Sequence, residues 1–329
     1  ATGRLGTRGR ARWALERGKV LLNGADASMA DAGVRLQVGD AVRLWLDRPG
    51  SASARYRPAR RDGELPIVYE DDAVIVVNKP AGLLTVPLAR RQDAVSVAEL
   101  LVQHMRGQGG RRPLAVHRID RDTSGLVMFA KHPAAQRALK AQFEAHEPER
   151  VYLAVVHGIP AESEGRWIDW LVWDGDELVQ TVARAGDPRA KESRLAYTVA
   201  DAWPAVPAAL LQVRLETGKR NQIRVQAQRH GHPLIGEQMY VDARPYTVAR
   251  CVTEFPRQAL HAWRLVCRHP SSGRRLALEA PMPDDLQELV HSLGRYGLGE
   301  RRPKGQIPKK RSSRRGPTRD VRRLRDSKE

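Results

Sequence analysis

The chain has 329 residues and a mass of 36.7 kDa. At about 100–200 residues per domain, this length predicts one large domain and a smaller one. Hydrophobic residues make up 41% and charged residues 29% of the chain, which is typical of soluble proteins, and no segment approaches the ~20 apolar residues of a membrane-spanning helix. The basic first residues lack the apolar part of a secretory signal. Two cysteines, Cys251 and Cys267, exclude a disulfide framework and indicate a cytoplasmic protein.

Charge is the strongest feature of the composition. There are 56 Lys and Arg residues against 38 Asp and Glu, a net charge of +18. The last segment, 301–329, holds thirteen Lys or Arg residues and three acids and carries +10, so the rest of the chain carries +8. Such an excess predicts a polyanionic partner, most simply a nucleic acid. The alternative is an arginine-rich composition with a basic tail that only improves solubility.

The N-terminal part, residues 4–48, reads as a small basic domain. The segment RGRARWALERGK, 8–19, predicts a helix, and VLLNG, 20–24, predicts a strand. A turn at 38–40 precedes a second strand, AVRLWL, at 41–46. On the predicted helix four arginines could share one face and contact RNA phosphates: Arg8, Arg10, Arg12 and Arg17. Residues 49–64 are rich in Pro, Gly, Ser, Ala and Arg and read as a linker.

Residues 65–296 read as the main domain. The hydrophobic patterns predict helices over 96–106, 134–146, 221–230 and 284–293, and strands over 67–69, 74–77, 126–130, 151–156, 193–199, 210–215 and 259–266. Helices and strands do not alternate strictly. The prediction is therefore an α+β fold with a mainly antiparallel sheet. Residues 297–329 contain almost nothing apolar, so they are predicted to form a disordered basic tail.

The densest group of polar side chains lies at 117–124, HRIDRDTS, just before the apolar strand LVMFA. Asp120 stands between Arg118 and Arg121. A carboxylate flanked by guanidinium groups stays ionised near neutral pH and could act as a nucleophile or a base. The alternative is a polar loop with structural ion pairs.

Three other segments carry weaker signals. Thr217-Gly218 ends a strand and is followed by a basic helix start with Lys219, Arg220 and Arg224, which suits phosphate binding or simply a solvated helix face. Tyr152 lies in an apolar strand, and residues 79–82 form a Lys-Pro-Ala-Gly turn. The sequence contains no Walker A motif, no G-x-G-x-x-G motif and no H-E-x-x-H motif, and it predicts no metal site.

Together these segments resemble one family. VYEDDAVIVVNKPAGLLTVP, AVHRIDRDTSGLVMFAK, RVYLAVVHG, LETGKRNQIRVQAQRHGHPLIGEQMYV and RQALHAWRLVCRHPSSG occur in the order and spacing of RluA-type RNA pseudouridine synthases. The resemblance covers about 65–295. Residues 4–48 resemble, more weakly, the ribosomal-protein S-four type of RNA-binding domain. Many family members have a His before Q-I-R and a single Arg after Thr-Gly, whereas Lys219, Arg220 and Asn221 occupy that stretch here.

The resemblance implies roles for individual residues. Asp120 matches the catalytic aspartate and Arg224 the arginine that pairs with it. Tyr152 matches the tyrosine that stacks on the target base and is proposed to move a proton. Arg118 matches the arginine that enters the base stack in place of the flipped uridine. The further residues expected to contact the substrate RNA are His117, Ile223, Lys219 and Arg220.

The implied reaction turns uridine into pseudouridine, an isomerisation that needs no cofactor. Ribosomal RNA, mainly of the large subunit, is the favoured partner because of the N-terminal domain, with transfer RNA as the second candidate. A monomer is favoured. The sequence leaves the modified uridine and the elementary step of Asp120 open. The alternative function is a non-catalytic RNA-binding or ribosome-assembly protein that keeps the fold, although such a protein would not need Asp120, Tyr152 and Arg224.

Overall fold

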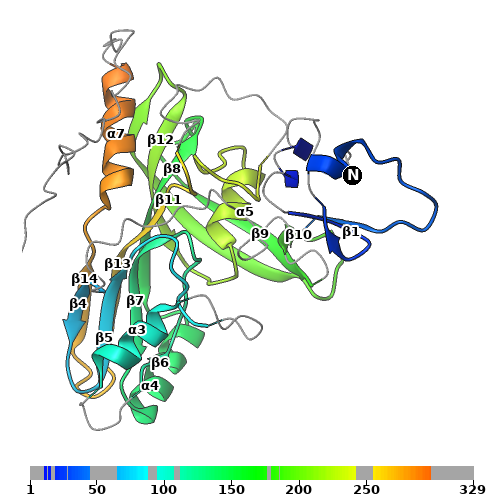
Figure 1. Ribbon diagram of the computed structural model, residues 1–329. Helices are drawn as coiled ribbons and strands as arrows, with labels where there is room; N and C mark the ends of the chain where they lie inside the picture. The colour runs from blue at the N-terminus through cyan, green and yellow to red at the C-terminus, as the bar shows by residue number, and fades with distance from the viewer. Residues whose placement is uncertain are drawn as a thin grey trace, which may run out of the picture.

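A broad sheet dominates the computed structural model, which describes residues 11–12, 14–15, 19–27, 29–44, 65–87, 95–106, 112–175, 179–184, 186–241 and 255–297. The strand order is β10-β9-β11-β12-β8-β13-β7-β5-β4, and β14 pairs with β13 and β6 with β7 (Figure 1). The strands are β4 (Ile67–Glu70), β5 (Val74–Lys79), β6 (Leu114–Ala115), β7 (Ser124–Ala130), β8 (Glu149–His157), β9 (Glu164–Asp174), β10 (Val179–Val182), β11 (Lys191–Trp203), β12 (Ala208–Leu215), β13 (Leu260–Arg268) and β14 (Arg275–Glu279).

The strand pairing confirms the predicted α+β class. Within the described ranges every neighbouring pair in this sheet is antiparallel, except β7 and β13, which run parallel. The helices are α3 (Val97–His104), α4 (Pro133–Glu144), α5 (Gln222–Arg229) and α7 (Asp284–Gly297). They correspond to the four helices that the sequence predicts, with ends that differ by at most four residues.

Alternation along the central strands places helices on both faces of the sheet. Ile75 of β5 lies in the same apolar cluster as Leu101 of α3. The next residue, Val76, lies in a second cluster with Leu139 of α4. Because successive strand residues point to opposite faces, an unbroken apolar strand such as β5 must be covered on both sides. Figure 1 shows α3 and α4 beside this part of the sheet.

The last helix packs through one apolar stripe. Leu286, Leu289 and Leu293 are buried at positions i, i+3 and i+7 of α7, in a cluster with Val155 and Trp203 of the sheet. The helix thus covers the end of β8 and β11. No helix in the described part of the chain is long and apolar enough to span a membrane.

A separate three-stranded sheet forms the N-terminal part, in the order β2 (Ala25–Asp26), β1 (Val20–Leu22), β3 (Val42–Leu44). Asn23 and Gly24 make the hairpin turn with φ angles of 51° and 83°, as Asn-Gly turns require. The Asn23 side chain donates to Asp40 and accepts from the Ala41 N–H, both at 2.8 Å. The predicted strands and the turn at 38–40 are confirmed here. Most of the predicted helix, the linker 49–64 and the tail after 297 lie outside the described residues.

Four strands of the large sheet were not predicted: β6, β9, β10 and β14. No element is predicted between 157 and 192, where β9 and β10 lie. Trp167 and Leu171 of β9 point into the core, whereas Ile168 and Trp170 are about half exposed. Large apolar side chains on both faces hide the two-residue alternation by which a half-buried strand is recognised.

A glycine fixes the close approach of β7 to β13 beside the Asp120 loop. Gly125 has φ of +112°, and a Cβ atom there would collide with the backbone of Ala262. Gly125→Ala should lower the free energy of unfolding by roughly 2–5 kcal/mol, because backbone strain and overpacking add. Thermal unfolding measures this loss. Gly273 is the matched control: its φ is +67° but nothing lies within 4 Å, so Gly273→Ala should cost only about 1–2 kcal/mol. Equal effects of the two substitutions would contradict the close-approach argument.

Candidate active site

The loop that carries Asp120, residues 117–123, is fixed from one side by Lys79 at the end of β5. The Lys79 side chain is fully buried, and its Nζ donates to the backbone carbonyls of Pro80 at 3.0 Å, Leu83 at 2.8 Å and Arg121 at 2.8 Å. Three acceptors match the three N–H donors of an ammonium group. The Lys-Pro turn, which by sequence is merely a turn, therefore ties β5 to the Asp120 loop.

The same loop is held from the other side by the segment before β13. Arg257 is 2% exposed and forms two bonds to Asp285 of α7, from Nε at 2.7 Å and from Nη2 at 2.9 Å. Its Nη1 donates to the Asp122 carbonyl at 3.2 Å. The Gln258 amide donates to the Thr123 hydroxyl at 3.2 Å. The first turn of α7 thus supports the loop through a buried arginine.

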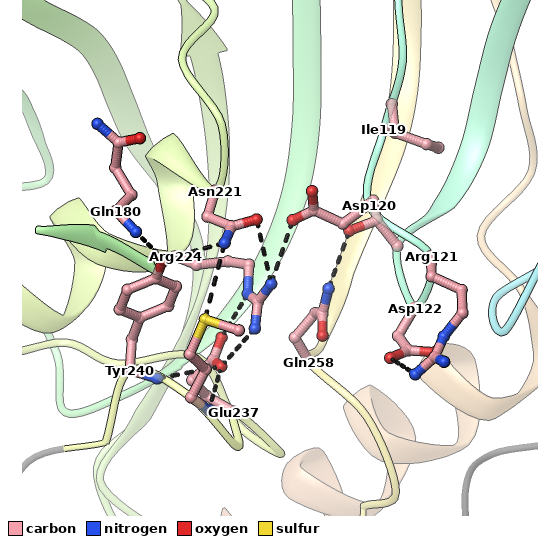
Figure 2. A network of polar contacts seen from close by, with 12 residues as sticks. Ile119, Asp120, Arg121, Asp122, Gln180, Asn221, Arg224, Glu237, Tyr240 and Gln258 are labelled. Atoms are coloured by element: carbon pink, nitrogen blue, oxygen red, sulfur yellow. Dashed lines mark hydrogen bonds and ion pairs between the residues drawn. The ribbon is translucent and has the colours of Figure 1, made fainter. Parts of the chain in front are cut away.

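Arg224 on α5 points toward Asp120 (Figure 2). Its Nη1 lies 3.3 Å from Asp120 Oδ2. A second carboxylate binds Arg224 more tightly: Nε donates to Glu237 Oε2 at 2.8 Å and Nη2 to Glu237 Oε1 at 2.7 Å. The Tyr240 ring lies against the guanidinium group of Arg224, whose carbon is 5.2 Å from the ring centroid. The structure therefore brings together the predicted pair and adds Glu237, which the sequence analysis missed.

Glu237 acts as a buried counter-ion for Arg224. Its side chain is 1% exposed, and Oε1 also accepts the backbone N–H groups of Met239 at 2.8 Å and Tyr240 at 3.3 Å. Burial alone would raise the pKa of the Glu237 carboxyl, but the charge and hydrogen bonds of Arg224 and these N–H groups outweigh it and hold this pKa below its ordinary value. Both groups stay charged at neutral pH, so Arg224 is fixed in place before any substrate arrives.

Tyr152 on β8 and Ile223 on α5 form the apolar side of the site. Both are buried and belong to the central apolar cluster together with Ile119, the neighbour of Asp120. The Tyr152 hydroxyl makes no hydrogen bond to any described residue. Burial raises the pKa of this hydroxyl, and the charge of Asp120 raises it further. Tyr152 is therefore a protonated phenol next to a carboxylate that keeps 25% of its surface exposed.

His117 and Arg118, at the start of the loop, differ in their surroundings. Arg118 is exposed, as an arginine that contacts RNA must be. His117 accepts the Met128 N–H at 3.0 Å and stacks on Phe143 with 4.7 Å between ring centroids. Burial, and to a smaller extent the charge of Arg150, lowers the pKa of His117 to about 3. This ring is neutral and packed, and its contact with RNA stays a prediction.

The basic stretch before α5 lies at the surface. Arg220 is exposed and stacks on Trp173, with its guanidinium carbon 4.0 Å from the ring centroid. Lys219 is half-buried, and its backbone N–H donates to the Gln222 side chain at 3.0 Å. Arg12 is exposed, whereas Arg8, Arg10 and Arg17 lie outside the described residues. RNA contacts by these residues stay predictions.

The site therefore combines an oriented carboxylate, a protonated phenol and an arginine with a buried counter-ion. Such a set can take up or release protons and can stabilise charge. Within the described ranges, no group of three or more His, Cys, Asp or Glu side chains is placed to hold a metal ion.

Comparisons with known proteins place the chain in a family. The model of the family described as RNA pseudouridylate synthase matches residues 73–229. Ribosomal large subunit pseudouridine synthase D of Zymomonas mobilis is 38% identical over 245 residues, which are 72% of this chain and 76% of that protein. The chain belongs to the RNA pseudouridine synthase family. A similar protein of Pseudomonas aeruginosa carries the same name and is 36% identical, over 71% of this chain and 73% of its own.

Further similar proteins belong to the same family or share its fold. An uncharacterized RNA pseudouridine synthase of Bacillus subtilis is 34% identical over 85% of this chain and 87% of its own. The solved structure of human RNA pseudouridylate synthase domain containing 4 covers 70% of this chain and 93% of its own, with 20% identity and a TM-score of 0.57. That likeness supports the fold alone. Members of the family are isomerases, so the predicted enzyme class is confirmed at this level.

Glu237 and Tyr240 are the site residues that sequence reasoning missed in this synthase. Both lie in the quoted motif LIGEQMYV, about fifteen residues after Arg224. A carboxylate in an otherwise apolar segment that follows a buried helix was the signal that could have found Glu237, because such a group needs a cationic partner.

Proposed function

We propose that the protein isomerises uridines of large-subunit ribosomal RNA to pseudouridine, as an RluA-type enzyme in which Asp120 carries the chemistry. The observation on which this rests is the contact of Asp120 with Arg224, which is itself held by Glu237. The names of the relatives from Zymomonas mobilis and Pseudomonas aeruginosa support ribosomal RNA as the substrate. Residues 4–48 would form a small RNA-binding domain of the S-four type that adds phosphate affinity.

The reaction breaks the bond between N1 of uracil and C1′ of the ribose and forms a bond between C5 and C1′. N1 gains a proton and C5 loses one, so the RNA keeps the same composition. The target uridine must first leave its stack, which costs a few kcal/mol. Arg118, which is exposed, would fill the gap. Tyr152 would stack on the base and take part in the proton transfer at C5, while Asp120 starts the reaction at the sugar or the base.

Pseudouridine mapping tests the substrate directly. Large-subunit ribosomal RNA from a strain that lacks this gene should lose pseudouridine at one or a few positions, and the purified protein should restore them on that RNA. Transfer RNA from the same strain is the internal control and should be unchanged. Losses in transfer RNA alone would contradict the ribosomal assignment. If neither RNA changes and the protein still binds RNA, the non-catalytic alternative would replace this proposal.

A further inference from the structure

Asn221, the residue before α5, has a backbone that does not suit an ordinary helix start. Its φ is 52° and its ψ is 21°, in the left-handed region, which asparagine tolerates better than most other residues. It occupies the N-cap position, where asparagine usually bonds to the first turn of the helix, but its side chain makes no capping bond. The residue is 7% exposed. Its amide lies between Asp120 and Tyr240 (Figure 2), so the side chain serves the site and not the helix.

The hydrogen-bonding groups around this amide decide which end faces Asp120. In the orientation drawn in Figure 2, Oδ1 of Asn221 points toward the Asp120 carboxylate, so two hydrogen-bond acceptors face each other. With the amide turned by 180°, Nδ2 lies 3.0 Å from Asp120 Oδ1 and 3.0 Å from Oδ2, and Oδ1 accepts the Tyr240 hydroxyl at 3.0 Å. The turn gives up a 3.3 Å bond from Arg224 Nη1 to Asn221 Oδ1 and a weak 3.7 Å bond from Nδ2 to the Met239 sulfur. The Arg224 bond that is lost and the Asp120 bonds that are gained each involve a charged group. The turn gains two bonds of 3.0 Å to the carboxylate for one of 3.3 Å, and it separates two facing acceptors, so the turned amide is favoured.

Tyr240 holds the amide in that orientation. Its oxygen already accepts the Gln180 N–H at 3.0 Å, so its own proton needs an acceptor. Burial raises the pKa of Tyr240 to about 12, and the hydroxyl therefore keeps this proton at neutral pH. Asn221 Oδ1 is the acceptor in the turned orientation. One chain of hydrogen bonds then runs from the Gln180 backbone through Tyr240 and Asn221 to Asp120.

We propose that Asn221 is a positioning residue for Asp120, donating its amide N–H groups to the carboxylate so that Asp120 meets the flipped uridine in one fixed orientation. This inference rests on the proposed function, in which Asp120 carries the chemistry. Arg224 alone gives Asp120 a single bond of 3.3 Å, which leaves the carboxylate free to rotate. The amide spans both oxygens and removes that freedom, and fixed geometry of a reacting group is a large part of catalysis.

Two substitutions separate this role from a structural one. Asn221→Asp keeps the size and tolerates the left-handed backbone, but it replaces the donors by a second carboxylate. Asn221→Gly suits the same φ angle and removes the side chain. With RNA as substrate, both should lower kcat by about 10- to 100-fold or more, as expected for lost hydrogen bonds to a charged group. KM for RNA should stay within about threefold, since phosphate contacts dominate affinity. Tyr240→Phe should lower kcat less, because the donors remain.

The outcomes are distinct. If the parent protein forms pseudouridine and folded Asn221→Asp is equally active, or is impaired in KM alone, Asn221 is a structural residue and the inference is wrong. If the parent protein is inactive on all RNA offered, the proposed function fails first and this inference fails with it. A loss in kcat with unchanged KM and unchanged thermal unfolding, in both Asn221→Asp and Asn221→Gly, is the supporting result.

Discussion

Asp120→Asn should abolish the release of tritium from C5 of labelled uridine in RNA. We expect a loss of at least about 1,000-fold, because a neutral amide is neither a nucleophile nor a base near neutral pH. The fold should survive, since the substitution keeps the size of the side chain and the loop is held by Lys79 and Arg257 rather than by Asp120. RNA binding should also survive, because Lys and Arg contacts to phosphates provide most of the affinity.

Asp122 provides the matched control for this prediction. It lies in the same loop, and its carboxylate forms two bonds to Arg121, at 3.1 Å and 3.0 Å. Asp122→Asn makes the same chemical change two residues away and should reduce the rate by less than about tenfold, because this carboxylate bonds to its neighbour Arg121 within the loop. Tritium release by Asp120→Asn near the parent rate would disprove its role. Equal losses in both variants would show that the loop as a whole, and not Asp120, had been damaged.

Arg224→Met should unfold at a much lower temperature as well as lose activity. It leaves Glu237 buried without a cation, and removing one partner of a buried ion pair costs about 3–5 kcal/mol. Arg189 is the control, because it pairs with Asp187 but is 72% exposed. Arg189→Met should cause only a small loss of stability, because exposed ion pairs are screened by water. The free energy of unfolding in urea measures both losses.

The pH dependence of stability should separate the two roles of Arg224. In the parent protein the pKa of Glu237 is lowered. The contribution of this carboxylate to stability is therefore fully present above the ordinary glutamate pKa of about 4.3, and it is lost only as the pH falls below that value. In Arg224→Met the pH dependence of stability should have the opposite sign. Burial without a cation favours the protonated form of Glu237, so stability should fall as the pH rises from 5 to 8. Combining Arg224→Met with Glu237→Gln should restore much of the stability but not the activity. If stability returned together with activity, Arg224 would have only a structural role.

Local patterns determined much of this protein. The helices α3, α4, α5 and α7 and most strands of the large sheet follow from hydrophobic periodicity, because the period of apolar residues depends only on neighbours in the chain. The α+β class and the antiparallel preference followed from the order of these elements. Five motifs in order were enough to identify the family. The sequence also predicted Asp120, Tyr152 and Arg224 as site residues, and the structure shows Arg224 in contact with Asp120. Strand β9, with apolar side chains on both faces, could not.

What only the tertiary structure decided is which groups meet. Arg224 and Asp120 are 104 residues apart in the chain, and the sequence alone does not tell which carboxylate an arginine binds most tightly. The structure shows that Glu237 holds Arg224 and leaves one bond for Asp120. The left-handed Asn221 is likewise invisible in sequence, where the pattern predicts the first residue of a helix. Burial decides both cases, because charged and polar groups removed from water must find partners, and the packing of α5 on the sheet fixes which partners are within reach.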